Sequence, residues 1–167
     1  MPEVGVEDIT WEELSPGTVM AVQHYLITPD DIREEAEAYE DHNPLYSDPE
    51  FAGKTDMGSV VAPFYLTLGE FVLPFTKVGK RISVNTIYAK SVRESFEPIR
   101  VGDMITKKFS VYEKYEKRGK NYITWLIEYI NEEGELCLRH LRTSYWVGTP
   151  QPFLKFDPSG QVVAGDK

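Results

Sequence analysis

The sequence predicts an α+β fold, in which one antiparallel sheet wraps around one long central helix. Three observations support it. A capped helix follows the first strand, residues 60–75 are apolar on nearly every face, and β-rich runs joined by short turns fill the second half. The 167 residues fit one domain. We expect a single domain over residues 1–167, with a loose N-terminal arm at 1–16 and an irregular tail at 149–167.

The first strand is expected at residues 17–28, where an apolar, β-branched segment lies between Pro-Gly and a second proline. A helix should follow directly. Thr28 suits the N-cap, and Pro29 suits the first helical position, where a missing N–H costs nothing. The helix should run to about Glu40. Its buried face is marked by residues at helical spacing, namely Ile32, Ala36 and Tyr39.

The long buried helix is expected from Ala62 to Phe75. Pro63 suits a first helical turn, and the apolar residues after it cover nearly every face, which is typical of a helix buried on all sides. The preceding residues, 41–58, have the composition of a loop with one short helix at Pro49–Ala52.

The second half predicts strands, because it lacks helix caps and is rich in β-branched and aromatic residues. A turn is expected at Val101–Asp103, Gly119 lies in the next connection, and Asn131–Gly134 resembles a short hairpin loop. The four expected strands are residues 82–98, 104–115, 122–130 and 136–147.

Composition and charge argue against several classes of protein. A net charge of −9 repels phosphate backbones, so a nucleic-acid partner is not expected. No apolar run approaches the roughly 20 residues of a membrane span, and the acidic N-terminal residues lack the basic flank of a signal peptide. A single cysteine, Cys137, favours a reducing compartment. We expect a cytoplasmic protein with no membrane association, no metal and no cofactor.

Residues 41–46, with the sequence Asp-His-Asn-Pro-Leu-Tyr, carry a family resemblance. MaoC-like dehydratases and (R)-specific enoyl-CoA hydratases have a Gly-Asp-x-Asn-Pro-aliphatic-His motif after the first helix. Each matching piece alone is weak, since Asn-Pro and Gly-Asp occur in many turns, but five pieces in the family's order are specific. The four further matches are Asp48–Ala52, Gly58–Pro63, Pro98–Asp103 and Asn131–Leu136.

The chain resembles this family over residues 17–146, and most closely the dehydratase domains related to fungal fatty acid synthase. The resemblance implies a hotdog fold and reversible addition of water to a trans-2-enoyl thioester of coenzyme A or acyl carrier protein. In the family, an aspartate and a histidine hold the reacting water. By position, Asp41 matches the aspartate, Asn43 fixes the loop, Glu40 replaces the glycine, and Tyr46 stands at the histidine.

Tyr46 is the main departure from the family. A tyrosine has an unperturbed pKa of about 10, so it is a poor base near neutral pH, although it can donate a hydrogen bond. His42 is a second candidate for the missing histidine, although adjacent loop residues usually point apart. The family's oxyanion donor lies at the start of the central helix, near Ala62 and Phe64. Because Pro63 has no N–H, Phe64 is the favoured donor.

Structural roles compete with these assignments. Asp41 could be a helix-terminal turn residue, and Asp48 and Asp103 suit cap and turn positions. The basic residues at 114–120 suit a solvated hairpin, with a site for the coenzyme's phosphates as the alternative. Two histidines in expected strands are interpreted as structural, His24 and His140.

Three functions fit the sequence. The first is an active hydratase or dehydratase that uses Asp41 with a non-histidine partner. The second is a non-catalytic subunit that binds the acyl chain and stabilises a catalytic hotdog partner, since some family members work as unequal pairs. The third is a hotdog thioesterase with Glu70 as its carboxylate. Because such a sheet leaves exposed strand edges, we expect at least a dimer, either a homodimer or a heterodimer.

Overall fold

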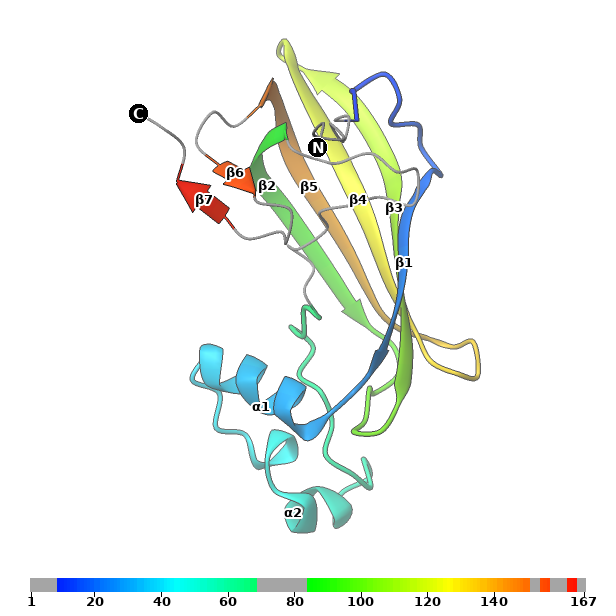
Figure 1. Ribbon diagram of the computed structural model, residues 1–167. Coiled ribbons are helices and arrows are strands. Elements are labelled where there is room, and N and C mark those ends of the chain that lie inside the picture. The colour runs from blue at the N-terminus through cyan, green and yellow to red at the C-terminus, as the bar shows by residue number, and fades with distance from the viewer. Residues whose placement is uncertain (1–8, 69–83, 151–153, 157–161, 165–167) are drawn as a thin grey trace, which may run out of the picture.

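A computed structural model describes residues 9–68, 84–150, 154–156 and 162–164 (Figure 1). Its main feature is a five-stranded antiparallel sheet in the order β1-β3-β4-β5-β2. Beyond one end of the sheet, α1 (Pro29–Ala38), the 3-10 helix η1 (Pro44–Tyr46) and α2 (Pro49–Gly53) lie side by side (Figure 1). The strands are β1 (Val19–Leu26), β2 (Val84–Ser95), β3 (Met104–Lys117), β4 (Lys120–Ile130) and β5 (Leu136–Pro150). The α+β class, the five expected strands, the helix after the first strand and the short helix at Pro49 are confirmed, whereas η1 was not expected.

The described part of the expected central helix is not helical. Residues 62–68 contain turns, and the N–H of Leu66 donates to the carbonyl of Pro63 at 3.0 Å. Val61 forms an isolated β-bridge with Arg100, so the chain is still extended where the helix would have to begin. The expected start at Ala62 is therefore wrong, and residues 69–75 lie outside the described residues.

The core covers the face of the sheet that alternate residues of β3 and β4 line, as the two-residue period of a strand requires. The rings of Phe109 and Trp125 stack there with centroids 4.9 Å apart. Other buried side chains on these two strands are Ile105, Val111, Ile123, Ile127 and Tyr129.

Three expectations are corrected: the buried face of α1, the loose N-terminal arm and the irregular tail. Tyr39 is 60% exposed, so only Ile32 and Ala36 form the buried face of α1. Residues 9–16 are not a loose arm, because Leu14 is fully buried and Trp11 packs on Trp146 with ring centroids 5.6 Å apart. The tail is not wholly irregular, since β5 continues to Pro150 and a two-stranded sheet follows. Its strands are β6 (Leu154–Phe156) and β7 (Val162–Ala164).

Local turn and cap residues act as expected. Asp48 caps α2 by accepting from the N–H groups of Glu50 and Phe51, and Asp103 accepts from the N–H of Arg100 at 2.8 Å. In the β3–β4 hairpin, Arg118 and Gly119 both have positive φ. Two such residues form the tight turn whose twist matches that of the flanking strands.

The two histidines interpreted as structural lie on strands. His24 on β1 contacts the hydroxyl of Thr106 at 3.0 Å. His140 on β5 is buried and contacts the hydroxyl of Ser91 at 2.8 Å. Among the described residues, no helix is both long and apolar enough to cross a bilayer.

Candidate functional site

The way in which α1 ends positions Asp41. The N–H of Asp41 donates to the carbonyl of Ala36 at 2.9 Å, and the N–H of Glu40 donates to that of Glu37 at 3.0 Å. This pair of bonds is the Schellman pattern, which places the residue after the C-cap in the left-handed region. Glu40 accordingly has a φ of 53°. Glycine adopts this conformation without steric cost, which explains the glycine of the resembled family at this position.

Asn43 then holds the loop that follows Asp41. Its side-chain oxygen accepts from the N–H of Leu45 at 3.0 Å, which caps η1. Its own N–H donates to Oδ1 of Asp41 at 3.1 Å. The loop therefore keeps one oxygen of the Asp41 carboxylate turned back on the backbone, while His42 is exposed to solvent.

The other oxygen of Asp41 faces a residue that the sequence analysis missed. The hydroxyl of Tyr65 donates to Oδ2 of Asp41 at 2.8 Å. Tyr65 falls within the expected apolar helix, and its role could not be inferred from that pattern. The one available signal was chemical, because a phenol within an apolar stretch usually finds a hydrogen-bond partner when it is buried.

Three aromatic rings surround Tyr65. The ring centroid of Tyr39 lies 4.5 Å away, that of Phe64 5.4 Å away and that of Tyr46 6.5 Å away. The Tyr46 ring meets Tyr65 nearly edge-on, at 80°. These contacts bring residues from the end of α1, from η1 and from the turn at 63–66 into one aromatic cluster around the carboxylate.

Burial and the nearby carboxylate keep both site hydroxyls protonated. The pKa of Tyr65 is raised, first by burial and then by its hydrogen bond to Asp41 and the charge of that group. The pKa of Tyr46 is raised by burial and by the charge of Asp41, against a smaller lowering by a hydrogen bond with Asn43. At neutral pH neither phenol is a base, and each can donate a hydrogen bond.

Side chains from three strands fix the segment that carries Tyr65. Arg93 on β2 donates to the carbonyls of Leu66 at 3.1 Å and Phe64 at 3.4 Å. Tyr129 on β4 donates to the carbonyl of Thr67 at 2.8 Å, and Lys107 on β3 donates to that of Leu68 at 2.7 Å. The sheet thus supplies donors to the backbone carbonyls of this partly buried segment.

The same turn orients the expected oxyanion donors. The N–H of Ala62 is already used, because it donates to the carbonyl of Ile99 at 2.7 Å. The N–H groups of Phe64 and Tyr65, inside the turn, have no acceptor within the described part of the chain. Phe64 is also 61% exposed. Within the described residues, the turn at 63–66 therefore offers two N–H groups without an acceptor, in the segment whose Tyr65 hydroxyl contacts Asp41.

A cavity of about 330 Å³ adjoins this cluster, and Tyr46 forms part of its wall. Its other walls come from the first turns of α1, the residues just before and at the start of α2, the residues at 58–60 and Val101. No group of three His, Cys, Asp or Glu side chains in the described ranges could hold a metal ion. Glu70, the carboxylate of the thioesterase hypothesis, lies outside the described residues.

A family model described as the FAS1-like, dehydratase domain region matches residues 15–139. The chain belongs to this family. The expected membership in the MaoC-like hotdog family is thereby confirmed. No curated protein matches the chain.

Solved structures agree in fold. The monoamine oxidase regulatory protein from Archaeoglobus fulgius is 27% identical, with a TM-score of 0.70 over 86% of this chain and 97% of that chain. The R-hydratase PhaJ1 from Pseudomonas aeruginosa is 20% identical, with a TM-score of 0.69 over 92% and 96%. The HadBC complex from Mycobacterium tuberculosis, a 3R-hydroxyacyl-ACP dehydratase, is 18% identical, with a TM-score of 0.62 over 78% and 96%. This dehydratase-family chain therefore has the hotdog fold.

Proposed function

We propose that the chain catalyses the reversible addition of water to a trans-2-enoyl thioester, with Asp41 as the general base. The observation that carries the proposal is the 2.8 Å hydrogen bond between Tyr65 and Asp41, beside the loop that matches the family's catalytic motif. This bond gives the Asp41 carboxylate a second polar group, the Tyr65 hydroxyl, in a chain that has Tyr46 in place of the family's histidine. Family membership and the structural similarity to an R-hydratase support the same reaction class.

Asp41 takes a proton from water as the water oxygen bonds to the β-carbon of the enoyl group. The electrons of the double bond move toward the thioester carbonyl. The α-carbon then takes the proton back from the Asp41 carboxyl group, so that one water is added in total and the carboxylate is regenerated. Tyr65 orients the carboxylate through its hydrogen bond, and Tyr46 offers a protonated hydroxyl to the water. In this division of roles Asp41 is the base, and the hydroxyls of Tyr65 and Tyr46 are the two hydrogen-bond donors.

The N–H groups of Phe64 and Tyr65 serve the thioester oxygen, on which enolate charge develops. Donors fixed in advance stabilise such charge without reorganisation. The bonds from Arg93, Tyr129 and Lys107 hold the turn that carries these N–H groups.

The test is hydration of a short trans-2-enoyl-CoA, followed by loss of the conjugated absorbance. Asp41→Ala should abolish the activity, and Tyr46→His should raise it by restoring an imidazole base. Asp56→Ala is the matched control, since Asp56 is an exposed carboxylate outside the site. Full activity in Asp41→Ala would overturn the assignment.

The second candidate is a non-catalytic subunit that binds the acyl chain beside a catalytic hotdog partner. It is favoured by Tyr46, whose raised pKa leaves even less phenolate available at neutral pH than an ordinary tyrosine has. The structural neighbour HadBC is a complex, which supports pairing with a second chain. Purified chain that is inactive alone, and active with a partner carrying the intact motif, would favour this candidate.

We expect assembly as at least a dimer, in the cytoplasm. The sheet leaves β1 and β2 at its edges, and an unpaired edge is a surface that proteins usually cover. Four large apolar side chains on and after β2 are exposed, namely Ile87, Tyr88, Val92 and Phe96. Light scattering at micromolar concentration checks this, and a monomer would count against self-association.

A further inference from the structure

The face of the sheet opposite the core is built from the residues that alternate with the core residues of β3 and β4, and from their neighbours on β5 and β2. We call it the outer face. Strand register aligns its residues in rows that run across β3, β4, β5 and β2 in that order (Figure 1). Three of these rows are Lys108, Glu128, Arg139 and Glu94; Ser110, Leu126, Leu141 and Val92; and Tyr115, Tyr122, Tyr145 and Ile87.

Two of these rows are mainly apolar. The ring of Tyr122 stacks on that of Tyr115 with centroids 5.3 Å apart, and lies 5.7 Å from that of Tyr145. At the ends of the two rows, Tyr115, Ile87 and Val92 are exposed. Single apolar side chains on a surface are normal, but a contiguous set that spans four strands indicates a surface that a partner covers.

The third row is charged and alternates in sign. Lys108 pairs with Glu128 at 3.5 Å, and Arg139 pairs with Glu94 at 2.7 Å. From β3 to β2 the charges are therefore positive, negative, positive and negative. The side chains of Lys108, Arg139 and Glu94 are 40%, 38% and 41% exposed, so each can meet a partner without leaving its own pair.

This order of charges is complementary to itself. A two-fold axis parallel to the strands, between β4 and β5, lays β3 of one copy on β2 of the other, and β4 on β5. Lys108 then faces Glu94 of the second copy, and Glu128 faces the second copy's Arg139. All four charges meet opposite charges. An axis across the strands would instead set Lys108 against Lys108 wherever the charged rows meet.

The same axis also matches the apolar rows. It places Leu126 opposite Leu141 of the second copy, at the centre of the contact, and it sets the tyrosine row against itself. Packed sheets lie about 10 Å apart with their strands at about 30°, so facing rows cross at a shallow angle. Lysine, arginine and glutamate side chains are long enough to reach across that angle.

We propose that the outer face binds a second copy of this chain, sheet against sheet, about a two-fold axis parallel to β4 and β5. This interface is distinct from the strand edges, and the two kinds of contact together would form a tetramer. It is also independent of the proposed catalytic role, because the turn near Asp41 is held from the core side of the sheet, by Arg93, Lys107 and Tyr129.

Complementary charge reversal tests the proposal. Lys108→Glu sets two carboxylates against each other, and Glu94→Lys does the same with two ammonium groups. Each variant alone should raise the Kd of self-association about 100-fold, because each dimer gains two like-charge contacts. An equimolar mixture of the two variants should associate nearly as tightly as the unaltered chain, since both contacts in the mixed dimer join opposite charges. Sedimentation equilibrium measures all three.

The mixture separates contacts between copies from contacts within a chain. Each substitution also breaks an ion pair in its own chain, with Glu128 or with Arg139, and mixing cannot repair that pair. Lys54→Glu and Glu50→Lys are the matched controls, because they reverse the charges of a pair on α2 and should leave association unchanged. Failure of the mixture to associate, or an unaltered chain that is monomeric at micromolar concentration, would overturn the proposal.

Leu141→Arg tests the centre of the interface. Four arginine and leucine side chains cannot pack there without burying charge, so the variant should lose the outer-face contact. A tetramer should become a dimer, and a dimer should become a monomer. An unchanged mass would assign the association to the strand edges and overturn the proposal. If circular dichroism shows that Leu141→Arg does not fold, the mixture of Lys108→Glu and Glu94→Lys chains decides the question.

Discussion

The hydroxyl of Tyr65 lies 2.8 Å from Oδ2 of Asp41, although 24 positions separate the two residues in the chain. The bond joins the end of α1 to the turn at residues 63–66. It gives the carboxylate a fixed donor and leaves the phenol protonated. The geometry of the proposed base therefore depends on two segments that local sequence does not connect.

Tyr65→Phe should lower hydratase kcat by about 10- to 100-fold, the effect of losing a hydrogen bond to a charged group worth about 1.5–3 kcal/mol. The ring remains, so the aromatic cluster should persist. Steady-state kinetics with Tyr39→Phe as the control measure this, since Tyr39 contacts Tyr65 through its ring. A Tyr65→Phe variant with unchanged kcat would remove Tyr65 from the site.

Alkaline pH should weaken the fold partly through Tyr65. Its pKa in the folded chain is raised, so its stabilising contribution is present below the unfolded value and is lost as pH rises toward the folded value. Between about pH 9 and pH 11, around the ordinary tyrosine pKa, Tyr65→Phe should lose less unfolding free energy than the unaltered chain. Urea unfolding across this range checks it, with the exposed Tyr112→Phe as the control. Equal slopes for all three proteins would contradict it.

Glu40→Gly should raise the free energy of unfolding by about 1 kcal/mol, because it relieves a left-handed conformation that costs a non-glycine residue about that amount. The same change at Glu34, an exposed position within α1, should lower it by about 1 kcal/mol, the usual penalty for glycine in a helix. Thermal and urea unfolding measure both. Destabilisation by Glu40→Gly would refute the argument.

Lys107→Met should destabilise the chain by about 1–3 kcal/mol, because the buried carbonyl of Leu68 loses its donor. Lys108→Met is the matched control. The Lys108 ammonium lies on the other face of β3, where it forms a partly exposed ion pair with Glu128 at 3.5 Å. Removing it should lower the free energy of unfolding by no more than about 0.5 kcal/mol. Urea unfolding should separate the two variants, and similar losses would show that Lys107 has no special role.

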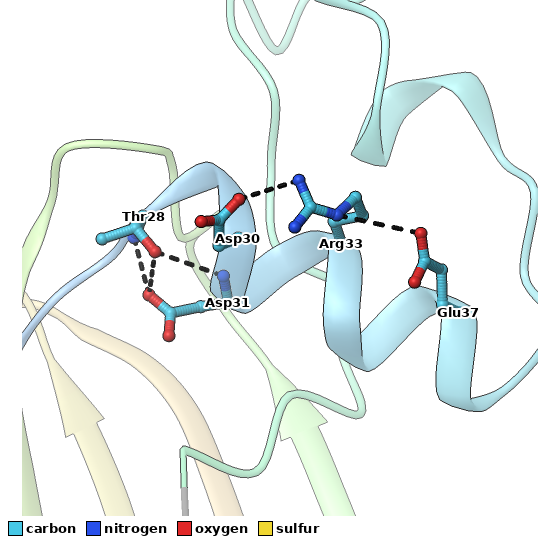
Figure 2. A network of polar contacts seen from close by, with 5 residues as sticks. All are labelled: Thr28, Asp30, Asp31, Arg33 and Glu37. Atoms are coloured by element: carbon cyan, nitrogen blue, oxygen red, sulfur yellow. Dashed lines mark hydrogen bonds and ion pairs between the residues drawn. The ribbon is translucent and has the colours of Figure 1, made fainter.

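Elements with local signals were predictable from the sequence. The start of α1 is a capping box between Thr28 and Asp31, with both bonds formed at 2.8 and 3.2 Å (Figure 2). The strands followed from their β-branched and aromatic residues between turn signals, and the loop at 41–46 followed from its composition. Each of these signals depends on residues a few positions apart, which is why sequence alone could indicate them.

The features that the sequence could not predict depend on long-range contacts. The apolar pattern after Ser59 correctly indicated burial, since Val60, Val61, Leu66 and Leu68 are buried. It did not determine conformation, because a buried turn and a buried helix carry similar residues. The bonds from Lys107 and Tyr129 to this segment, and that from Tyr65 to Asp41, join distant positions without any local motif.

The side-chain donors that hold residues 66–68 also set an order of assembly. Arg93 reaches Leu66 across 27 positions, Lys107 reaches Leu68 across 39, and Tyr129 reaches Thr67 across 62. Contacts this distant in sequence form late, because closing long loops costs entropy before the contacts compensate. During synthesis, the proposed catalytic loop can emerge and cap α1 well before Tyr129 exists. The proposed site is then complete only when β4 has joined the sheet. A partly synthesised chain therefore contains the motif at residues 41–46 but not the complete site.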